Sequence, residues 1–259
     1  MHGHQPRKRF GQNFLADSHY VARIIDAIAP RPGDNIVEIG PGLGALTGAL
    51  VERAGRIAAI EIDRDLTARL RDRFAADFVA LYETDALAFD FGTLGTHLRV
   101  VGNLPYNISS PLLFHLGGHA STVRDIHVML QRELVARMTA QPSTPDYGRL
   151  TVTLQCRFEI TRLFTVPPGA FRPAPNVESA VARLVPLRDS KPRILDEPLF
   201  ARIVAAAFGQ RRKTLRNALA GVVSDAQLRD ADIDPSARGE TLAVADFVRL
   251  ANELAEASP

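Results

Sequence analysis

The chain has 259 residues, a length that fits one large domain or a large domain followed by a small one. Its hydrophobic content of 46% and charged content of 23% are those of an ordinary globular protein. The single cysteine, Cys156, excludes an internal disulfide and any metal site built from several cysteines. The basic start of the chain is not followed by the apolar core of a signal peptide, and no apolar segment is long enough to span a membrane, so we expect a cytoplasmic protein with no membrane partner.

The net charge of +2 is unevenly distributed. Residues 218–259 contain eight acidic side chains and three arginines, a net charge of −5, which leaves about +7 on the rest of the chain. The stretch 201–217 has no acidic residue and contains Arg211, Arg212, Lys213 and Arg216. Such a stretch is typical of a surface that binds a polyanion, but a solvated helix face has the same composition, and charge alone does not separate the two.

Strands and helices alternate in the first part of the chain. Asp17 is a predicted N-cap, followed by apolar residues at helical spacing up to Ile28. Further along, the patterns predict strands at 35–39, 56–60, 78–82, 98–102 and 126–130, and helices at 45–53, 66–75 and 132–138. This alternation predicts an α/β fold of the Rossmann-like type, with a mostly parallel sheet and helices on both faces.

The pattern changes after residue 141. Residues 150–158 and 180–185 predict two further strands, which would form an antiparallel edge and make the sheet mixed. Residues 188–198 are polar and contain two prolines, and the pattern from residue 199 onward is helical. We therefore predict a Rossmann-like first domain at 1–187, with a flexible leader at about 1–10, and a small helical domain at 188–259.

A glycine-rich loop and an acidic residue after it predict a cofactor site. Gly40, Gly42 and Gly44 lie between a strand and a helix, where glycine allows the backbone to approach a ligand and the helix offers free N–H groups. Glu61 ends the next strand and can accept hydrogen bonds from ribose, which nicotinamide dinucleotides and S-adenosylmethionine share. The G-x-G-x-G spacing differs from the dinucleotide fingerprint and favours S-adenosylmethionine.

Two more acidic residues agree with that cofactor. Glu38 precedes the loop, where a carboxylate can order both the loop and the ammonium group of a bound methionine. Asp85 follows the third strand and can accept from the amino group of adenine. Asp63 is an alternative to Glu61 for the ribose, but Glu61 adjoins the strand end.

The sequence Asn103-Leu104-Pro105-Tyr106 follows a predicted buried strand, at the edge where open α/β sheets bind ligands. The Asn103 oxygen and the main-chain carbonyl on the Pro105 side can accept both hydrogens of an exocyclic amine, and Tyr106 can stack on its ring. These residues predict a site that methylates adenine N6. Enzymes of this kind take the base out of its stack, and Phe171 is the candidate for the second face of the ring, with core packing as the alternative.

Five segments together resemble the bacterial small-subunit rRNA adenine N6,N6-dimethyltransferases. In chain order they are 11–15 (GQNFL), 38–44, 103–106, 171–179 and 208–217, and the last two are the most specific. The resemblance implies dimethylation of two adjacent adenosines in a hairpin loop near the 3′ end of 16S rRNA, with four methyl groups from S-adenosylmethionine, S-adenosylhomocysteine as product and no metal. It also implies a role in small-subunit biogenesis. It places the following residues at the cofactor: Asn13, Leu15, Gly40, Glu61, Asp85 and Asn103.

The resemblance also gives the basic segment a function, because Arg211, Arg212 and Lys213, with Arg216 beside them, would contact rRNA phosphates of the small ribosomal subunit. Such contacts position the RNA without selecting the base. We expect a monomer. The alternatives are a 23S rRNA adenine methyltransferase of the macrolide-resistance type and a non-catalytic RNA-binding assembly or transcription factor of the same fold. A dinucleotide oxidoreductase is the weakest, because the glycine spacing does not match.

Overall fold

The protein is described from a computed structural model, in which residues 13–188 and 193–257 are described. The predicted leader at about 1–10, and the first two residues of the segment 11–15, lie outside the described residues. The chain divides into two compact units. Unit 1 comprises Met1–Val135 and Ile160–Pro186, and unit 2 comprises Ala136–Glu159 and Leu187–Pro259. The chain thus passes into unit 2 twice, and residues 136–159, which the sequence pattern placed in the first domain, belong to unit 2.

The predicted helices and strands are present with small shifts at their ends, apart from one segment in unit 2. A helix at 109–118 and a strand at 158–166 were not predicted, nor were two short strands at 14–15 and 171–172. The strands are β1 (Phe14–Leu15), β2 (Ile36–Ile39), β3 (Ile57–Glu61), β4 (Val79–Glu83), β5 (Leu98–Asn103), β6 (Val123–Gln131), β7 (Phe158–Val166), β8 (Phe171–Arg172) and β9 (Ser179–Pro186). The helices are α1 (Ser18–Ile28), α2 (Thr47–Ala54), α3 (Arg64–Arg73), α4 (Ser109–Gly118), α5 (Arg132–Met138), α6 (Arg149–Gln155), α7 (Glu197–Gly209), α8 (Leu215–Ala218), α9 (Asp225–Asp230) and α10 (Val244–Glu256), with short 3₁₀ turns at η2 (Phe91–Leu94), η3 (Pro168–Ala170) and η4 (Gly239–Thr241).

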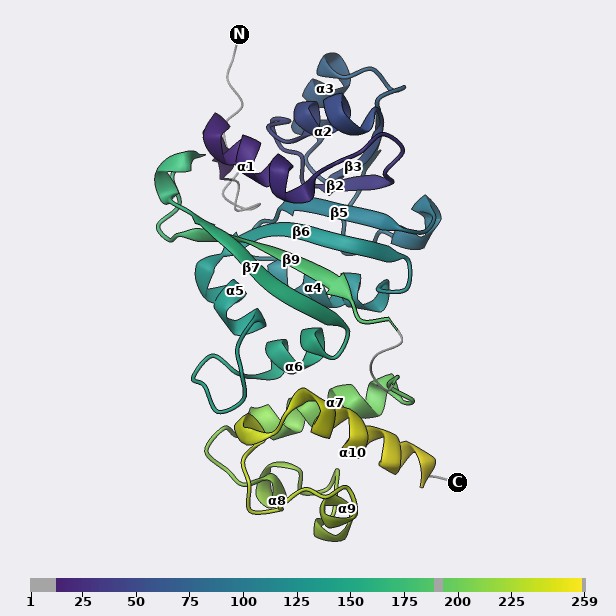
Figure 1. The fold of residues 1–259 in the computed structure, drawn as a ribbon, viewed down its shortest axis with the longest axis vertical. Coiled ribbons are helices and arrows are strands. Elements are labelled where there is room, and N and C mark those ends of the chain that lie inside the picture. The colour runs from purple at the N-terminus through teal and green to yellow at the C-terminus, as the bar shows by residue number, and fades with distance from the viewer. Residues whose placement is uncertain (1–12, 189–192, 258–259) are drawn as a thin grey trace. The chain divides into compact units, whose positions relative to one another are not determined.

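Unit 1 is built on a mixed sheet with the strand order β4-β3-β2-β5-β6-β9-β7, which Figure 1 shows as neighbouring ribbons. The strands from β4 to β6 are parallel, and β9 pairs antiparallel to β6. The Rossmann-like α/β fold with an antiparallel addition is therefore confirmed. A separate two-stranded sheet joins β1 to β8, with Leu15 opposite Phe171.

The central strands are buried because their apolar residues face helices on both sides. Residues 36–39 of β2 are buried without exception, and Leu98 to Val101 in β5 are equally inaccessible. One apolar cluster packs α1 and α2 against the sheet through Ile25, Leu50 and Val101. Asp17 caps α1 as predicted, since its carboxylate accepts from the N–H of His19 at 2.9 Å. This packing fixes the carboxyl ends of β2 to β5 along one edge.

Unit 2 is helical, with its own apolar core that includes Tyr147, Phe200 and Phe247. The predicted strand at 150–158 is wrong, because most of this segment is the helix α6. Its β-branched residues favour a strand by propensity, but Thr151 bonds the Arg137 carbonyl, at 2.6 Å, and Val152 is buried in the core of unit 2. Packing therefore overrides propensity. No helix in the described part of the chain is long and apolar enough to cross a membrane.

Candidate functional site

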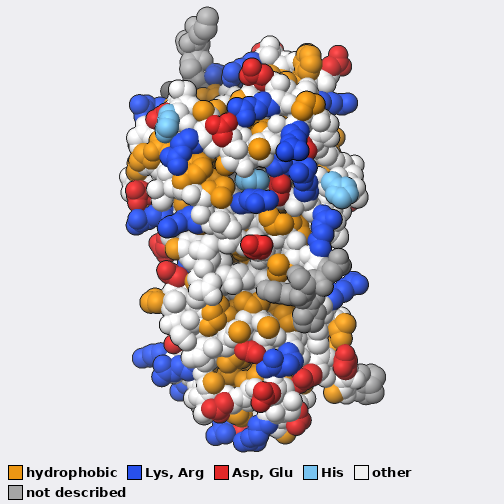
Figure 2. All heavy atoms as spheres, in the orientation of Figure 1, with side chains coloured by type: hydrophobic (Ala, Val, Ile, Leu, Met, Phe, Trp, Pro, Cys, Tyr) orange, Lys and Arg blue, Asp and Glu red, His pale blue; other side chains and the backbone are white. Residues whose placement is uncertain are grey.

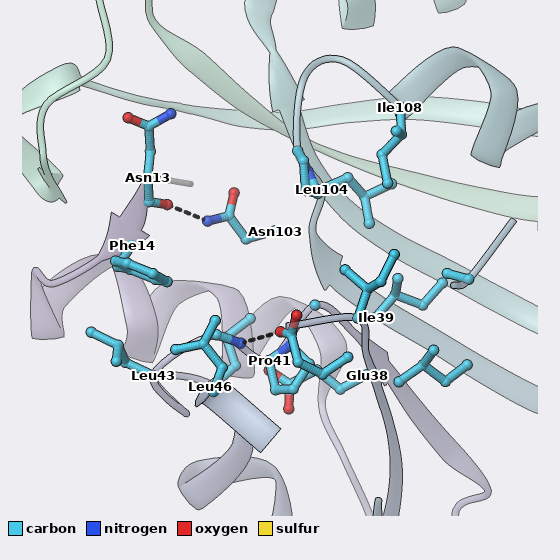
Figure 3. A pocket seen from close by; sticks show the side chains of 18 of the residues that line it. Asn13, Phe14, Glu38, Ile39, Pro41, Leu43, Leu46, Asn103, Leu104 and Ile108 are labelled. Carbon is cyan, nitrogen blue, oxygen red and sulfur yellow. Dashed lines mark hydrogen bonds between the residues drawn. The ribbon is translucent and has the colours of Figure 1, made fainter. Parts of the chain in front are cut away.

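A pocket of about 280 Å³ in unit 1 lies at the carboxyl ends of the parallel strands (Figure 3). Ligands bind at this edge in open α/β sheets because loops there diverge above the strand ends. All the predicted cofactor residues except Gly44 line the pocket: Asn13, Leu15, Glu38, Gly40, Gly42, Glu61, Asp85 and Asn103. Leu104, Pro105 and Tyr106 line it as well, whereas Phe171 does not.

The glycine loop adopts a backbone that other residues rarely take. Gly40, Gly42 and Gly44 have φ angles of +65°, +59° and +80°. A Cβ on Gly42 would lie 3.0 Å from the ring of Phe14, which covers the loop from the N-terminal segment. Gly44 instead faces α3, where a Cβ would meet the ring of Phe74 at 3.1 Å. The first two glycines shape the pocket wall, and the third permits close packing behind it.

Glu61 ties the glycine loop to the end of β3. Its carboxylate accepts from the N–H of Gly42, at 3.2 Å, and from the N–H of Asp63, at 2.9 Å. Burial raises the pKa of Glu61, and these two hydrogen bonds oppose the shift. Asp63, the alternative considered from sequence, is buried outside the pocket lining and caps α3 by accepting from the N–H of Asp65.

Glu38 is a buried carboxylate at the pocket wall, with its side chain hydrogen-bonded by the Thr47 hydroxyl, at 2.7 Å. Burial raises the pKa of Glu38 to about 7, the Thr47 bond opposes this, and the neighbouring charge of Glu61 adds to it. A carboxylate in this condition is incompletely compensated. A ligand with a positive charge would stabilise its ionised form.

Asp85 lies on the loop that follows β4. Its carboxylate accepts from the N–H of Leu87 at 2.9 Å, which shapes the loop into a turn beside the pocket. Farther along, the ring nitrogen Nε2 of His115 lies 2.8 Å from the carbonyl of Phe89, and the rings of Phe89 and Phe91 pack edge to face. The loop that carries Asp85 is thus held from helix α4.

Asn103 ends β5, and its amide has a fixed orientation. The Nδ2 group donates to the main-chain carbonyl of Asn13 at 2.9 Å (Figure 3). Because a carbonyl only accepts, the nitrogen must face Asn13 and the Oδ1 atom must point away from it. Among the described residues, Oδ1 has no hydrogen-bond partner, so it is available to a donor in the pocket.

The structure distinguishes the two carbonyls beside the proline. The Pro105 carbonyl accepts from the N–H of Ile108 at 3.2 Å and from the hydroxyl of Ser109 at 2.9 Å, which occupies both of its lone pairs. The Leu104 carbonyl has no hydrogen-bond partner among the described residues. The acceptor expected on the Pro105 side is therefore the Leu104 carbonyl that precedes the proline.

Tyr106 is half-buried at the pocket, and its hydroxyl lies 2.8 Å from that of Ser179. Burial raises the pKa of Tyr106, and the Ser179 bond opposes the shift. Phe171, in contrast, is only 1% exposed and packs in the core of unit 1 with Leu15. In the structure, Phe171 therefore packs in the core, which is the alternative considered from the sequence. Strand β8 buries its side chain, which does not line the pocket.

The sequence pattern missed two contributors to the site. Phe14 was treated as part of a short motif, yet its ring covers Gly42. Ser179 was treated as the end of a proline-rich segment, yet it holds Tyr106.

The basic segment in unit 2 contains two kinds of side chain. Arg211 pairs with Glu240 at 2.8 Å, and Arg216 pairs with Asp225 at 2.7 Å. Arg212 and Lys213 are exposed and make no ion pair with any described residue. The acids of the C-terminal segment thus neutralise two of these four side chains, and Figure 2 shows both charges interspersed around α8 and α9.

Comparison with known proteins identifies several similar chains. The family model for "Ribosomal RNA adenine dimethylase" matches residues 3–256. A protein named ribosomal RNA small subunit methyltransferase A from Aromatoleum aromaticum is 58% identical over 259 residues, which cover 100% of this chain and 98% of that protein. The protein of the same name from Thiobacillus denitrificans is 55% identical over 252 residues, covering 97% and 99% of the two chains.

Two solved structures are similar along nearly the whole chain. A dimethyladenosine transferase from Plasmodium falciparum superposes with a TM-score of 0.82 at 25% identity, covering 94% of this chain and 98% of that one. The 23S rRNA methyltransferase ErmE superposes with a TM-score of 0.68 at 27% identity, covering 94% and 100%.

Proposed function

The chain belongs to the family of ribosomal RNA adenine dimethylases, and from this premise we propose that the pocket of unit 1 holds S-adenosylmethionine and the target adenine side by side. The chain is an adenine methyltransferase of the small ribosomal subunit's RNA, as its relatives are named. The pair of acceptors at Asn103 Oδ1 and the Leu104 carbonyl carries the proposal for the site.

The pocket residues suit the cofactor. Gly40 and Gly42 leave room for the ligand next to the backbone, and Glu61 and Asp85 follow successive strands, as a ribose and an adenine ring would require. Glu38 lies closest in the sequence to the glycine loop and would stabilise the positive methionine end. Asn13 and Leu15 belong to the segment that covers the loop. S-adenosylmethionine supplies an activated methyl group on a sulfonium and leaves as S-adenosylhomocysteine, so the chemistry calls for no metal or covalent nucleophile.

The two acceptors explain how an unreactive amine is methylated. The lone pair of adenine N6 is delocalised into the ring, and hydrogen bonds from both N–H groups to fixed oxygens favour a more tetrahedral nitrogen. Methyl transfer would leave N6 positively charged, and N6 would then lose a proton to solvent water, because the amide and carbonyl oxygens that face it are weak bases. After the first transfer one N–H remains, so the second transfer uses one acceptor only.

Recognition of the RNA is divided between the two units. We place the target base on Tyr106, with stacking that contributes roughly 1–3 kcal/mol. Arg212 and Lys213 contact rRNA phosphates, with Arg211 and Arg216 as weaker contributors because they already pair with acids. The proposed substrate is a pair of adjacent adenosines near the 3′ end of 16S rRNA, within the small subunit or its precursor, and the enzyme acts as a cytoplasmic monomer during small-subunit biogenesis.

A labelled-methyl assay tests this function. The protein is incubated with unmethylated small-subunit particles and labelled S-adenosylmethionine, and N6,N6-dimethyladenosine is quantified in the 16S rRNA. We expect up to four methyl groups per particle, and no label in 16S rRNA would refute the proposal. Large-subunit particles in a parallel reaction test the 23S alternative, which the small-subunit names of the relatives disfavour.

The variant Asn103→Ala tests the site itself. It removes the Oδ1 acceptor and the Asn13 bond, and we expect turnover to fall at least a hundredfold, a size typical of losing one preorganised polar group. Its unfolding temperature should stay near that of the wild type because the side chain is only partly buried. Normal turnover would show that the amide does not act on the amine. Small-subunit maturation in cells with this variant is then compared with maturation in cells that lack the protein. Normal maturation with the variant but not with the deletion would reveal an assembly function separate from catalysis.

A further inference from the structure

We propose that Ser179 is a positioning residue for the target base, acting through the hydroxyl of Tyr106. The inference rests on the proposed function, because it assigns Tyr106 to the adenine. The two hydroxyl oxygens are 2.8 Å apart, although the residues are 73 positions apart in the sequence. The contact joins the loop after β5 to the first residue of β9.

Ser179 is a rigid anchor. Its side chain is fully buried, and its backbone pairs with Gln131 across the antiparallel ladder between β6 and β9. The residue before it is fixed too, since the Glu178 carbonyl accepts from the N–H of Arg132 at 2.9 Å and the two side chains pair at 3.0 Å. A group on such an element holds its partner in one place.

Tyr106 needs that anchor because it lies in an open part of the site. It follows β5 in a loop whose other hydrogen bonds to described residues involve Leu104 and Pro105 and not the Tyr106 ring. A tyrosine side chain has two rotatable bonds, and its hydroxyl oxygen lies on the axis of the second, so holding the oxygen fixes the first torsion. The ring plane is restricted as well, because a phenol hydroxyl donates and accepts close to the plane of its ring, which must therefore turn toward the Ser179 oxygen. Since stacking needs the ring parallel to the base, the Ser179 bond selects the ring orientation that receives an extruded adenine.

The inference also gives a use to the motif at 171–179. Phe171 at its start is in the core, so the motif does not supply the stacking ring. Its last residue instead sets the orientation of the ring that Asn103-Leu104-Pro105-Tyr106 supplies. The two sequence motifs therefore meet at a single hydrogen bond.

The test compares Ser179→Ala, Tyr106→Phe and the double variant, which remove the same bond from either side. The Ser179–Tyr106 bond acts only after the base has left its stack, so we expect kcat to fall about three- to tenfold when this bond is lost. KM should stay within twofold, because docking of the ribosomal particle depends on phosphate contacts. S-adenosylmethionine affinity, measured by calorimetry, should also stay within twofold. The double variant should be no slower than Tyr106→Phe alone, and Ser179→Thr, which keeps the hydroxyl, should recover at least half of the lost kcat.

A spectroscopic measurement reports on the ring directly. The chain has four tyrosines, so protein labelled with 3-fluorotyrosine gives a small set of ¹⁹F signals, and the Tyr106 signal is the one lost in Tyr106→Phe. In Ser179→Ala we expect this signal to shift and narrow as the ring becomes mobile. Tyr147→Phe is the matched control: it removes a buried hydroxyl that donates to the Leu242 carbonyl at 2.8 Å in unit 2, and should leave kcat unchanged.

The outcomes separate this inference from the proposed function. A wild-type protein that does not methylate small-subunit particles overturns the proposed function. An active wild type whose Ser179→Ala variant keeps its kcat and its Tyr106 signal overturns the positioning role alone. Independent, multiplying effects of the two single variants would also overturn it, because they would show that Ser179 and Tyr106 do not act through one bond.

Discussion

The buried carboxylate of Glu38 gives a quantitative prediction for cofactor binding. Its pKa is raised to about 7, chiefly by burial, so most of the ligand-free protein carries a neutral Glu38 at pH 6. S-adenosylmethionine brings an ammonium and a sulfonium, and a positive charge beside Glu38 favours the carboxylate. Binding at pH 6 must therefore release a proton, whereas binding at pH 8 need not.

The magnitude follows from the pKa. With a pKa of about 7, about one-tenth of Glu38 is ionised at pH 6 and about nine-tenths at pH 8, so the apparent Kd should be about tenfold higher at pH 6. The stability of the ligand-free protein changes in the opposite direction, falling with rising pH while the affinity for the cofactor increases. Between the ordinary glutamate pKa of 4.5 and the Glu38 pKa of about 7, the native state binds more protons than the unfolded chain, so the free energy of unfolding falls as pH rises through that window, by up to about 3 kcal/mol.

Calorimetric titration with S-adenosylmethionine at pH 6, 7 and 8, in two buffers of different ionisation enthalpy, measures both affinity and proton release. The control is Glu38→Gln, which keeps an acceptor for the Thr47 hydroxyl but cannot titrate. Glu61, whose pKa is also raised, remains in the variant, so the difference between the two proteins isolates Glu38. An equal pH dependence in both would refute the reasoning, as would a wild-type Kd that is constant from pH 6 to 8.

Three further variants test other parts of the structure. Gly102→Ala would place a Cβ 2.7 Å from the Ile39 carbonyl, so the strands must separate, and we expect a loss of about 1–3 kcal/mol in urea unfolding and weaker cofactor binding. Arg99→Met removes two buried ion pairs, with Asp34 at 2.7 Å and with Asp125 at 3.0 Å, and should cost about 3–5 kcal/mol near neutral pH because the buried Asp125 carboxylate loses its arginine. Although burial acts to raise the pKa of Asp34, the Arg99 hydrogen bond lowers it, so this difference should shrink as pH falls below about 4, where the carboxylate protonates in the unfolded chain. Arg212→Ala should weaken particle binding and reduce its salt dependence more than Arg211→Ala does. Of these two arginines, Arg211 already pairs with Glu240, whereas Arg212 has no ion pair with a described residue.

Much of unit 1 is predictable from local sequence because its strands are continuous apolar runs that end in polar residues. Parallel strands bring their carboxyl ends to one edge, so Glu61, Asp85 and Asn103 could be placed together without a structure. The glycine loop carries its own signal, since three positive φ angles call for glycine. These predictions depend on one strand and the residue that follows it.

The errors arise where distant segments decide the outcome. Residues 150–158 contain β-branched residues that suggest a strand, but Val152 packs in a helical core formed largely by residues after 193. Phe171 has the chemistry to stack on a base, but pairing of β8 with β1 buries it. Likewise, residues 201–217 contain no acidic partner for Arg211, and its ion pair forms only because Glu240 lies near it in space.

In the proposed site, the choice of the methylated atom depends on one such distant contact, between Asn103 and Asn13. An isolated asparagine can present either its oxygen or its nitrogen to a ligand, so Asn103 alone does not distinguish an amine from a carbonyl. The Asn13 carbonyl accepts from the Asn103 nitrogen, which leaves the Asn103 oxygen for the ligand. The Leu104 carbonyl is an acceptor whichever way the Asn103 amide is turned. A base with an amino group satisfies two acceptors, whereas a base with a carbonyl there, such as guanine, leaves buried oxygens unpaired at about 1–3 kcal/mol each. The preference for adenine over guanine therefore depends on the N-terminal segment that carries Asn13, ninety positions from the residue whose orientation it fixes.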